Sequence, residues 1–128
     1  ADLGRAPRAL VLPPGNHAVA LNTCYVLPCT DLVDAHAVAA LLNSPLIAAW
    51  LDPIAEPARG GYRRFLAWTV SLLPIPRSWP RARTLLAPLA ARAAHGNDPT
   101  DDELTRAAID AYCLHPDDIA PLLQWPRC

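Results

Sequence analysis

The 128-residue chain contains no lysine and no methionine, so its positive charge comes entirely from 11 arginines. The formal net charge is −1, which argues against a module that holds nucleic acid through bulk charge alone. Since a natural protein begins with methionine, its absence at position 1 leads us to expect a piece of a longer chain. Any chemistry that this stretch lacks would then lie in the part that is not included.

The sequence also lacks long apolar runs and a signal segment. No stretch reaches the roughly 18 apolar residues of a transmembrane helix, and the N-terminus lacks the charged-then-apolar order of a secretory signal. We therefore expect a cytoplasmic protein with reduced cysteines and no membrane partner. Cys24 and Cys29 form an isolated C-x4-C pair, so no metal site is predicted. A small zinc module that includes Cys113 and His115 stays a minor alternative.

Catalytic motifs are missing as well. The chain has no glycine-rich phosphate loop and no G-x-S-x-G nucleophile turn. Its carboxylates cluster at 98–103 and 117–118, at expected helix starts, where acids interact favourably with the helix dipole. The histidines are scattered and none has a spaced partner for base catalysis: His17, His36, His95 and His115. No catalytic residue is predicted in this chain.

What the sequence does have is a long apolar stretch, Asp34–Asp52, around which the rest is organised. Its apolar residues recur at the spacing of one helix face: Val38, Leu41, Leu42, Leu46, Ala49 and Trp50. The proline in Asn43-Ser44-Pro45 cannot donate to the preceding turn and pushes its neighbour out of the helical region. We predict two helices, Ala35–Leu42 capped by Asp34 and Pro45–Leu51 capped by Ser44.

Two segments have the composition of strands. Ala18–Leu27 reads AVALNTCYVL and is apolar on both alternating faces, as in a buried strand covered on both sides. Its polar exceptions, Asn22 and Thr23, either bond to neighbouring backbone or line a functional site. Tyr62–Leu66 is the second predicted strand. We expect these two strands to form a small sheet covered by the helix pair.

The second half of the chain is predicted to be mainly helical. A helical turn is expected at Thr69–Leu72, an extended stretch at Leu73–Pro76, and then a helix capped by Ser78. Thr100 and Glu103 have the spacing of a capping box. That box begins a helix over Asp101–Cys113, and a last helix runs from Pro116 to near Trp125.

These elements define the predicted architecture. The fold class is α+β, with a small mixed sheet packed against a broken helix pair and a helical C-terminal segment. Residues 1–17 form an irregular lead, 18–95 the α+β core and 96–128 the C-terminal helical segment.

The most distinctive polar cluster consists of Arg59, Gly60, Gly61, Tyr62, Arg63 and Arg64. Its guanidinium and backbone N–H groups can bind phosphates, and its tyrosine can stack on a base. In a strand, Arg63 and Arg64 point to opposite faces. We expect Arg64, on the side of Tyr62, to face DNA, and Arg63 to pair with an acid or follow the sheet edge. The competing interpretation is a solvated loop with ordinary ion pairs to Glu56 or Asp52.

Four motifs in order resemble a known family: Asn22-Thr23-Cys24-Tyr25, Leu41-Leu42-Asn43-Ser44-Pro45-Leu46, Gly60-Gly61-Tyr62-Arg63-Arg64-Phe65 and Leu73-Pro74-Ile75-Pro76. Together they resemble the C-terminal specificity domain of TaqI-like DNA methyltransferases. The closest likeness is to the branch in single-chain restriction–modification enzymes that methylate adenine at N6. Ala111-Tyr112-Cys113-Leu114 stands where the family usually has Y-G-L, with cysteine in place of glycine.

The resemblance implies a DNA target-recognition fragment whose partners are double-stranded DNA and a catalytic domain of the same parent chain. S-adenosylmethionine would bind that catalytic domain, not this chain. The candidate DNA-binding residues are the six of the arginine cluster together with Asn22 and Thr23. The alternative is a non-enzymatic interaction or scaffold domain with no nucleic-acid role.

Overall fold

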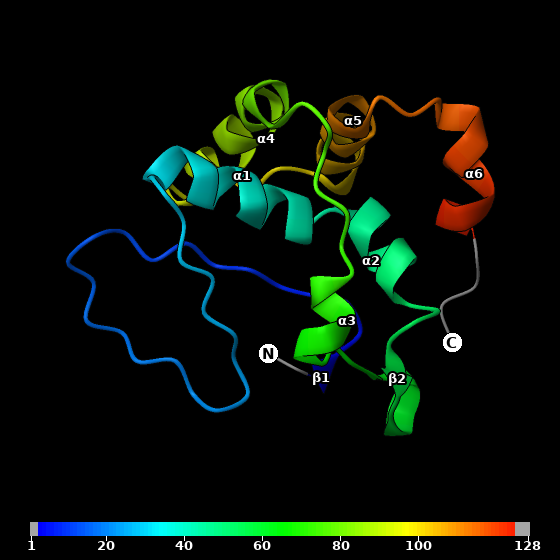
Figure 1. Ribbon diagram of the computed structural model, residues 1–128, viewed down its shortest axis with the longest axis horizontal. Helices are drawn as coiled ribbons and strands as arrows, with labels where there is room; N and C mark the ends of the chain where they lie inside the picture. The colour runs from blue at the N-terminus through cyan, green and yellow to red at the C-terminus, as the bar shows by residue number, and fades with distance from the viewer. Residues whose placement is uncertain (1–2, 125–128) are drawn as a thin grey trace.

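The computed structural model describes residues 3–124 and confirms the α+β class. Most of the helices gather at one end of the molecule, and a small antiparallel sheet lies at the other (Figure 1). The elements in chain order are β1 (Leu3–Gly4), α1 (Leu32–Leu42), α2 (Pro45–Leu51), β2 (Glu56–Pro57), the 3-10 helix η1 (Arg59–Gly61), β3 (Arg63–Arg64), α3 (Ala67–Ser71), α4 (Trp79–Ala93), α5 (Asp101–Tyr112) and α6 (Pro116–Gln124).

Helix α1 begins one turn earlier than predicted. Its N-cap is Asp31, whose carboxylate accepts from the Asp34 backbone N–H at 2.8 Å. The prediction that Asp34 is the cap is therefore wrong. Asp34 instead lies in the first turn and accepts from Trp79 Nε1 at 2.9 Å. Leu32 and Val33 in the added turn are exposed. The helix is predicted from a pattern of buried apolar residues, and this turn does not contribute to that pattern.

The break between α1 and α2 is confirmed. Ser44 caps α2 by accepting from the Ile47 backbone N–H at 3.3 Å, and Pro45 occupies the first turn. The Ser44 hydroxyl also donates to the Leu41 carbonyl at 2.7 Å, so this fully buried side chain joins the two helices. The helices meet at a bend of 62°.

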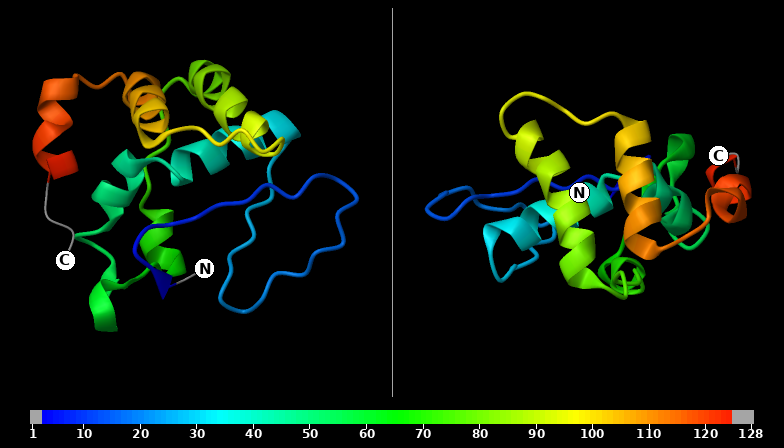
Figure 2. Two further views of the ribbon diagram at one scale, coloured as in Figure 1. Left: turned by 180° about the vertical axis from the view of Figure 1, so that it is seen from behind. Right: turned by 90° about the horizontal axis from the view of Figure 1, so that it is seen from above.

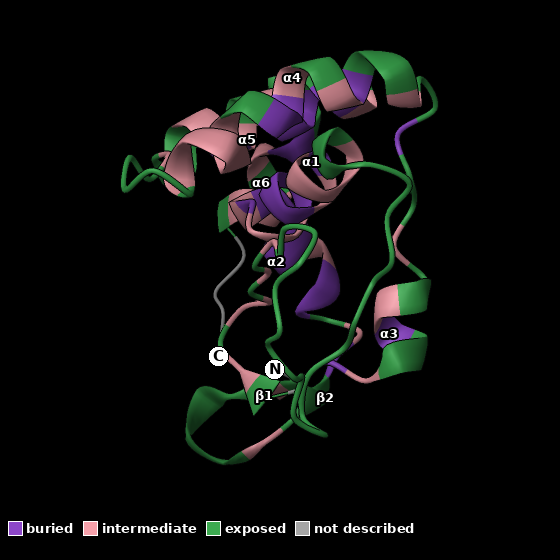
Figure 3. Cartoon of the chain, turned by 90° about the vertical axis from the view of Figure 1, so that its left-hand side faces the viewer, coloured by how far each residue is buried: buried purple, intermediate pink, exposed green. Residues whose placement is uncertain are grey.

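The core lies where α1, α2, α4 and α5 come together (Figures 2 and 3). Alanines supply much of the contact between helices, because a small side chain lets two backbones approach closely. Ala37, Ala82 and Ala108 are fully buried, one each on α1, α4 and α5. Of the predicted face, Leu41, Leu46 and Ala49 are buried, whereas Val38, Leu42 and Trp50 are half-buried.

The sheet has the order β1-β3-β2, with both pairings antiparallel. The predicted strand at Tyr62–Leu66 is present in shortened form as β3. The predicted strand at Ala18–Leu27 is wrong, since that segment is an exposed loop without strand structure. The expected pairing of this segment with β3 is not formed, because β1 and β2 occupy both edges of β3.

The C-terminal half agrees closely with the sequence. The capping box of α5 is complete: Thr100 Oγ1 accepts from the Glu103 N–H at 3.2 Å, and the Glu103 carboxylate accepts from the Thr100 N–H at 2.8 Å. Ser78 takes the N-cap position of α4 without a side-chain bond to the helix. The expected end of the last helix near Trp125 falls outside the described residues.

Within residues 3–124, no single helix has the length and apolar character needed to cross a membrane. The bent pair of α1 and α2 passes that test of length and composition when the two are taken together. Most residues of this pair are buried or half-buried by the other helices, as expected for a core element.

Candidate nucleic-acid interface

The register of the sheet separates two faces. Leu3 and Glu56 lie opposite Arg64, whereas Gly4 and Pro57 lie opposite Arg63. Because side chains alternate along a strand, the side chains of these two sets of opposed residues point to opposite faces of the sheet. The prediction that Arg63 and Arg64 diverge is therefore confirmed.

The inner face holds a nearly buried ion pair. Arg63 Nε donates to Asp52 Oδ1 at 2.9 Å and Arg63 Nη2 donates to Asp52 Oδ2 at 3.2 Å. The side chains are only 17% and 6% exposed. This two-point contact ties the sheet to the C-terminal end of α2, so Arg63 has a structural role, and the expectation that it pairs with an acid is confirmed.

The outer face carries exposed arginines and an exposed tyrosine ring. The Arg5 guanidinium lies over the Tyr62 ring, 5.7 Å from its centroid, as in a cation–π contact. Arg64 faces Glu56 across the strand pair at 3.9 Å, and both side chains are about half exposed. So loose and solvated a pair contributes little, which leaves the Arg64 guanidinium free to exchange its partner.

The turn between β2 and β3 adds a third arginine. Arg59 is exposed in η1 and forms no ion pair with the residues that the structure describes. Gly60 and Gly61 both have φ of 73°, in the left-handed region that glycine adopts without steric cost. Ala58 N–H donates to the Tyr62 carbonyl at 2.9 Å and closes this turn. The turn thus leaves Arg59 exposed, a few residues before Tyr62 and Arg64 in the chain.

Asn22 and Thr23 do not join this surface. They occupy a turn in the exposed loop, closed by the Cys24 N–H donating to the Leu21 carbonyl at 2.9 Å. That loop projects to one side of the molecule (Figures 1 and 2). Of the eight predicted residues, Arg59, Gly60, Gly61, Tyr62 and Arg64 lie at this turn and strand as exposed residues, Arg63 lies on the inner face, and these two lie elsewhere.

Sequence reasoning missed Arg5, which lies in the stretch expected to be an irregular lead. Residues of that stretch form β1 and pair with β3. No pattern in so short a strand predicts its pairing. Its only local signal is an arginine beside a glycine, which is too common to select it.

Two other motifs prove to be in contact with distant parts of the chain. The Tyr112 hydroxyl donates to the Pro74 carbonyl at 2.6 Å and so joins the end of α5 to the Leu73–Pro76 stretch. Burial raises the pKa of Tyr112 to about 12.

Cys113 has φ of 56°, the only positive φ of a non-glycine residue among those described. A left-handed residue after a helix is where glycine is favoured, which gives a physical reason for the usual Y-G-L.

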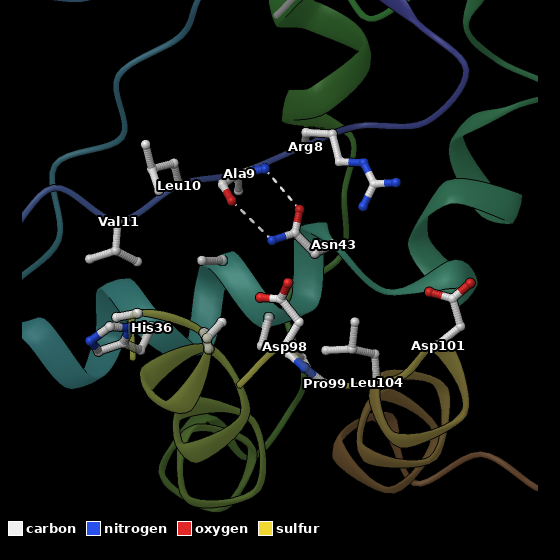
Figure 4. A pocket seen from close by; sticks show the side chains of 15 residues that line it. Arg8, Ala9, Leu10, Val11, His36, Asn43, Asp98, Pro99, Asp101 and Leu104 are labelled. Atoms are coloured by element: carbon white, nitrogen blue, oxygen red, sulfur yellow. Dashed lines mark hydrogen bonds between the residues drawn. The ribbon is translucent and has the colours of Figure 1, made fainter. Parts of the chain in front are cut away.

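One cavity lies elsewhere, between the N-terminal segment, α1, the end of α4 and the start of α5 (Figure 4). It measures about 470 Å³ and is lined by several alanines together with Arg8, His36, Asp98 and Asp101. Within residues 3–124, no three histidine, cysteine or acidic side chains are arranged to hold a metal ion. Cys24, Cys29 and Cys113 are exposed and unpaired with one another.

Comparisons of the chain with protein-family models, curated proteins and solved structures found no match. The resemblance to the methyltransferase specificity domain therefore rests on residues and motifs alone. Of those motifs, Asn22-Thr23-Cys24-Tyr25 lies in an exposed turn instead of at the start of a buried strand.

Proposed function

We propose that this chain is a DNA target-recognition fragment of a site-specific adenine-N6 methyltransferase or restriction–modification enzyme, and that the outer face of its sheet binds duplex phosphates. The observation that carries the proposal is that Arg59 and Arg64 are exposed in and beside β3, where the exposed Arg5 guanidinium lies over the Tyr62 ring. Phosphate contacts of this kind position a duplex without reading its sequence. The catalytic domain, with its S-adenosylmethionine, would belong to the same parent chain.

The local charge supports a phosphate-binding role better than the net charge suggests. Among residues 3–124, the acids that pair with arginines of the sheet are Asp52, which is bound to Arg63, and Glu56, which is loosely paired with Arg64. Many of the remaining acidic residues lie on α5 and α6, at the opposite end of the molecule (Figure 1). The charges that sum to −1 are therefore unevenly distributed, and the sheet presents a basic face. Exposed charges interact mainly within a Debye length of about 8 Å, so a phosphate at this face interacts chiefly with the nearby arginines.

The direct test is binding of a labelled duplex by fluorescence anisotropy over a range of salt concentrations. The double variant Arg59→Ala/Arg64→Ala should weaken binding to unrelated duplex sequences alike. The slope of log affinity against log salt should fall by about 0.9 for each phosphate group that the variant no longer neutralises. Arg77→Ala/Arg106→Ala is a matched control, because it removes the same charge from exposed positions outside the sheet.

Two further outcomes decide the role of these residues. Glu56→Gln should strengthen binding, since it removes the carboxylate that competes with phosphate for Arg64. If the double variant retains its affinity and salt slope, the proposed contact surface is wrong. Weaker binding confined to one duplex sequence would mean that the arginines read bases. Saturable binding of S-adenosylmethionine by calorimetry would contradict the assignment of that cofactor to another domain.

The second candidate function is a protein-interaction domain with no nucleic-acid role. The exposed apolar loop before α1 is the observation that favours it. Retention on heparin that decreases across a salt gradient discriminates between the two, because only the first candidate requires a phosphate-binding surface.

A further inference from the structure

The cavity between the N-terminal segment and the helices carries charges of both signs that are not paired with one another. Arg8 lies on the N-terminal segment, Asp98 shortly before α5 and Asp101 at its first residue, and all three line the cavity. Among residues 3–124, none of these three side chains forms an ion pair. Opposite charges that line one cavity without meeting are available to a ligand that carries both.

A buried ring nitrogen belongs to the same cavity lining. His36 lines the cavity from α1, and its Nδ1 is buried without a hydrogen-bond partner in the described part of the chain. A buried polar atom that lacks a partner costs free energy, and most such atoms in folded proteins are paired. A ligand with a polar group in its middle can supply the partner that the chain does not.

The rest of the lining is mainly small and apolar. Leu104 and five alanines of α1 and α4 contribute to it: Ala39, Ala40, Ala90, Ala93 and Ala94. The volume of about 470 Å³ falls within the range of small-molecule sites, about 300–1,000 Å³. An apolar lining with a few charged groups that fix the orientation of the ligand is typical of such sites.

The side of the cavity that carries Arg8 is fixed to the helices. The residue after it, Ala9, exchanges two hydrogen bonds with the Asn43 side chain, at 2.8 and 3.0 Å. Figure 4 shows Arg8 above the cavity, on the N-terminal segment, and Asp98 and Asp101 below it. The positive and negative side chains are therefore held on opposite sides of the cavity.

We propose that this cavity binds an apolar dipeptide with free ends. The ammonium of the dipeptide pairs with Asp98 and Asp101, and its carboxylate accepts two parallel N–H bonds from the Arg8 guanidinium. Its apolar side chains contact the alanines, and its peptide group is the partner of His36 Nδ1. The inference does not rest on the DNA-binding proposal, because the cavity and the sheet use different residues.

The separation of the charges favours a dipeptide over other small charged ligands. A simple cation or a simple carboxylate would leave the charges on one side of the cavity unpaired. In a single amino acid the ammonium and the carboxylate share one carbon atom, whereas the ends of an extended dipeptide lie about 7 Å apart. A dipeptide also provides the central N–H and C=O groups that the buried ring nitrogen requires.

Isothermal calorimetry of the full chain with the dipeptide leucylalanine tests the proposal. Binding should be saturable. The N-acetylated dipeptide lacks the ammonium and the C-terminally amidated dipeptide lacks the carboxylate, so each should bind about tenfold more weakly, as should free leucine. The absence of saturable binding overturns the proposal, and so does a blocked dipeptide or free leucine that binds as tightly as leucylalanine.

Variants of the charged residues locate the bound dipeptide. Arg8→Gln should weaken binding of leucylalanine about tenfold but leave binding of its C-terminal amide unchanged, because the amide has no carboxylate to pair with Arg8. Asp98→Asn/Asp101→Asn should weaken binding of leucylalanine in the same way but leave binding of the N-acetylated form unchanged. All three residues are exposed, so these variants should fold normally.

The matched controls remove the same charges from exposed positions outside the cavity lining. Arg77→Gln is the control for Arg8→Gln, and Asp102→Asn/Asp110→Asn is the control for the double aspartate variant. Both should bind leucylalanine as the unmodified chain does. Equal weakening by the controls, or unchanged binding in the cavity variants, would show that the dipeptide does not bind in this cavity and overturns the proposal.

Discussion

The side-chain amide of Asn43 pairs with both backbone groups of Ala9, a residue 34 positions away. Asn43 Oδ1 accepts from the Ala9 N–H at 2.8 Å, and Asn43 Nδ2 donates to the Ala9 carbonyl at 3.0 Å (Figure 4). The amide thus acts like one residue of a partner strand. It fixes the N-terminal segment across the end of α1 and forms one side of the 470 Å³ cavity.

Asn43→Ala should release this segment. The variant cannot form these two partly buried hydrogen bonds, so the free energy of unfolding should fall by about 1–3 kcal/mol. The Ala9 amide should also exchange with solvent deuterium much faster than in the unmodified chain. Denaturant unfolding and hydrogen exchange measure the two effects.

Asn43→Asp serves as the control for this contact. Its carboxylate can still accept from the Ala9 N–H but cannot donate to the Ala9 carbonyl, so protection of the Ala9 amide should be partly retained. Equal exchange rates at Ala9 in all three proteins would show that Asn43 does not hold the segment.

The start of α5 should respond to acid. The Arg92 side chain and the Thr100 N–H hold the pKa of Glu103 at about 2, below its ordinary value of 4.5. A lowered folded-state pKa contributes stability above the ordinary value, and that contribution is lost as the pH falls toward 2. Because Glu103 is solvent-exposed, salt should reduce the effect.

Glu103→Gln tests this expectation. The difference in unfolding free energy between the unmodified chain and the variant should be constant above pH 4.5 and shrink between pH 4.5 and 2. Asp102→Asn, which removes the same charge one residue earlier, should leave the acid-dependent loss in place. A difference that does not change with pH would contradict the assigned role of Glu103.

The features that local rules govern were predictable from the sequence. The Ser44 cap, the break at Pro45 and the capping box of Thr100 each depend on residues within one helical turn. The opposite orientation of Arg63 and Arg64 follows from the alternation of any strand. These parts of the fold and of the candidate site needed no knowledge of the rest of the chain.

What the sequence could not supply was the choice of partners. Ala18–Leu27 has the composition of a buried strand, but its expected partner β3 pairs with β1 and β2 on its two edges. Arg5 joins the site only because β1 is one of those partners. The contact between Asn43 and Ala9 could not be predicted for the same reason, since neither residue has a local pattern that indicates a distant partner.

Replacement of Cys113 by glycine should stabilise the folded chain. Its φ of 56° costs a side chain about 1–2 kcal/mol that glycine does not pay. Greater freedom of glycine in the unfolded chain offsets part of this gain, as does removal of the Arg81 hydrogen bond to Cys113 Sγ at 3.1 Å. Cys113→Gly should therefore raise the free energy of unfolding by about 0.5–1 kcal/mol.

Cys113→Ala separates conformation from chemistry. It removes the thiol but keeps a Cβ in the left-handed region, so it should not stabilise the chain. Thermal and denaturant unfolding compare the three proteins. A gain as large for alanine as for glycine would show that the thiol, not the backbone angle, limits stability.

Arg63 and Arg64 are adjacent in β3 and should differ sharply when each is replaced by alanine. Arg63→Ala leaves Asp52 unpaired at 5% exposure, and removal of one partner from a buried pair costs about 3–5 kcal/mol. Arg64→Ala removes an exposed ion pair of 3.9 Å, which is worth about 0–1 kcal/mol.

Unfolding in denaturant measures these losses of stability, and fluorescence anisotropy with a labelled duplex measures DNA binding. Under conditions where each variant is folded, Arg64→Ala should lower the salt dependence of DNA binding and Arg63→Ala should not, because their side chains lie on opposite faces of the sheet. Asp52→Ala/Arg63→Ala should cost less than the sum of the two single changes, as expected for residues in direct contact. If both single variants lose the same stability and the same salt dependence, the separation of the sheet into a structural face and a DNA-binding face is wrong.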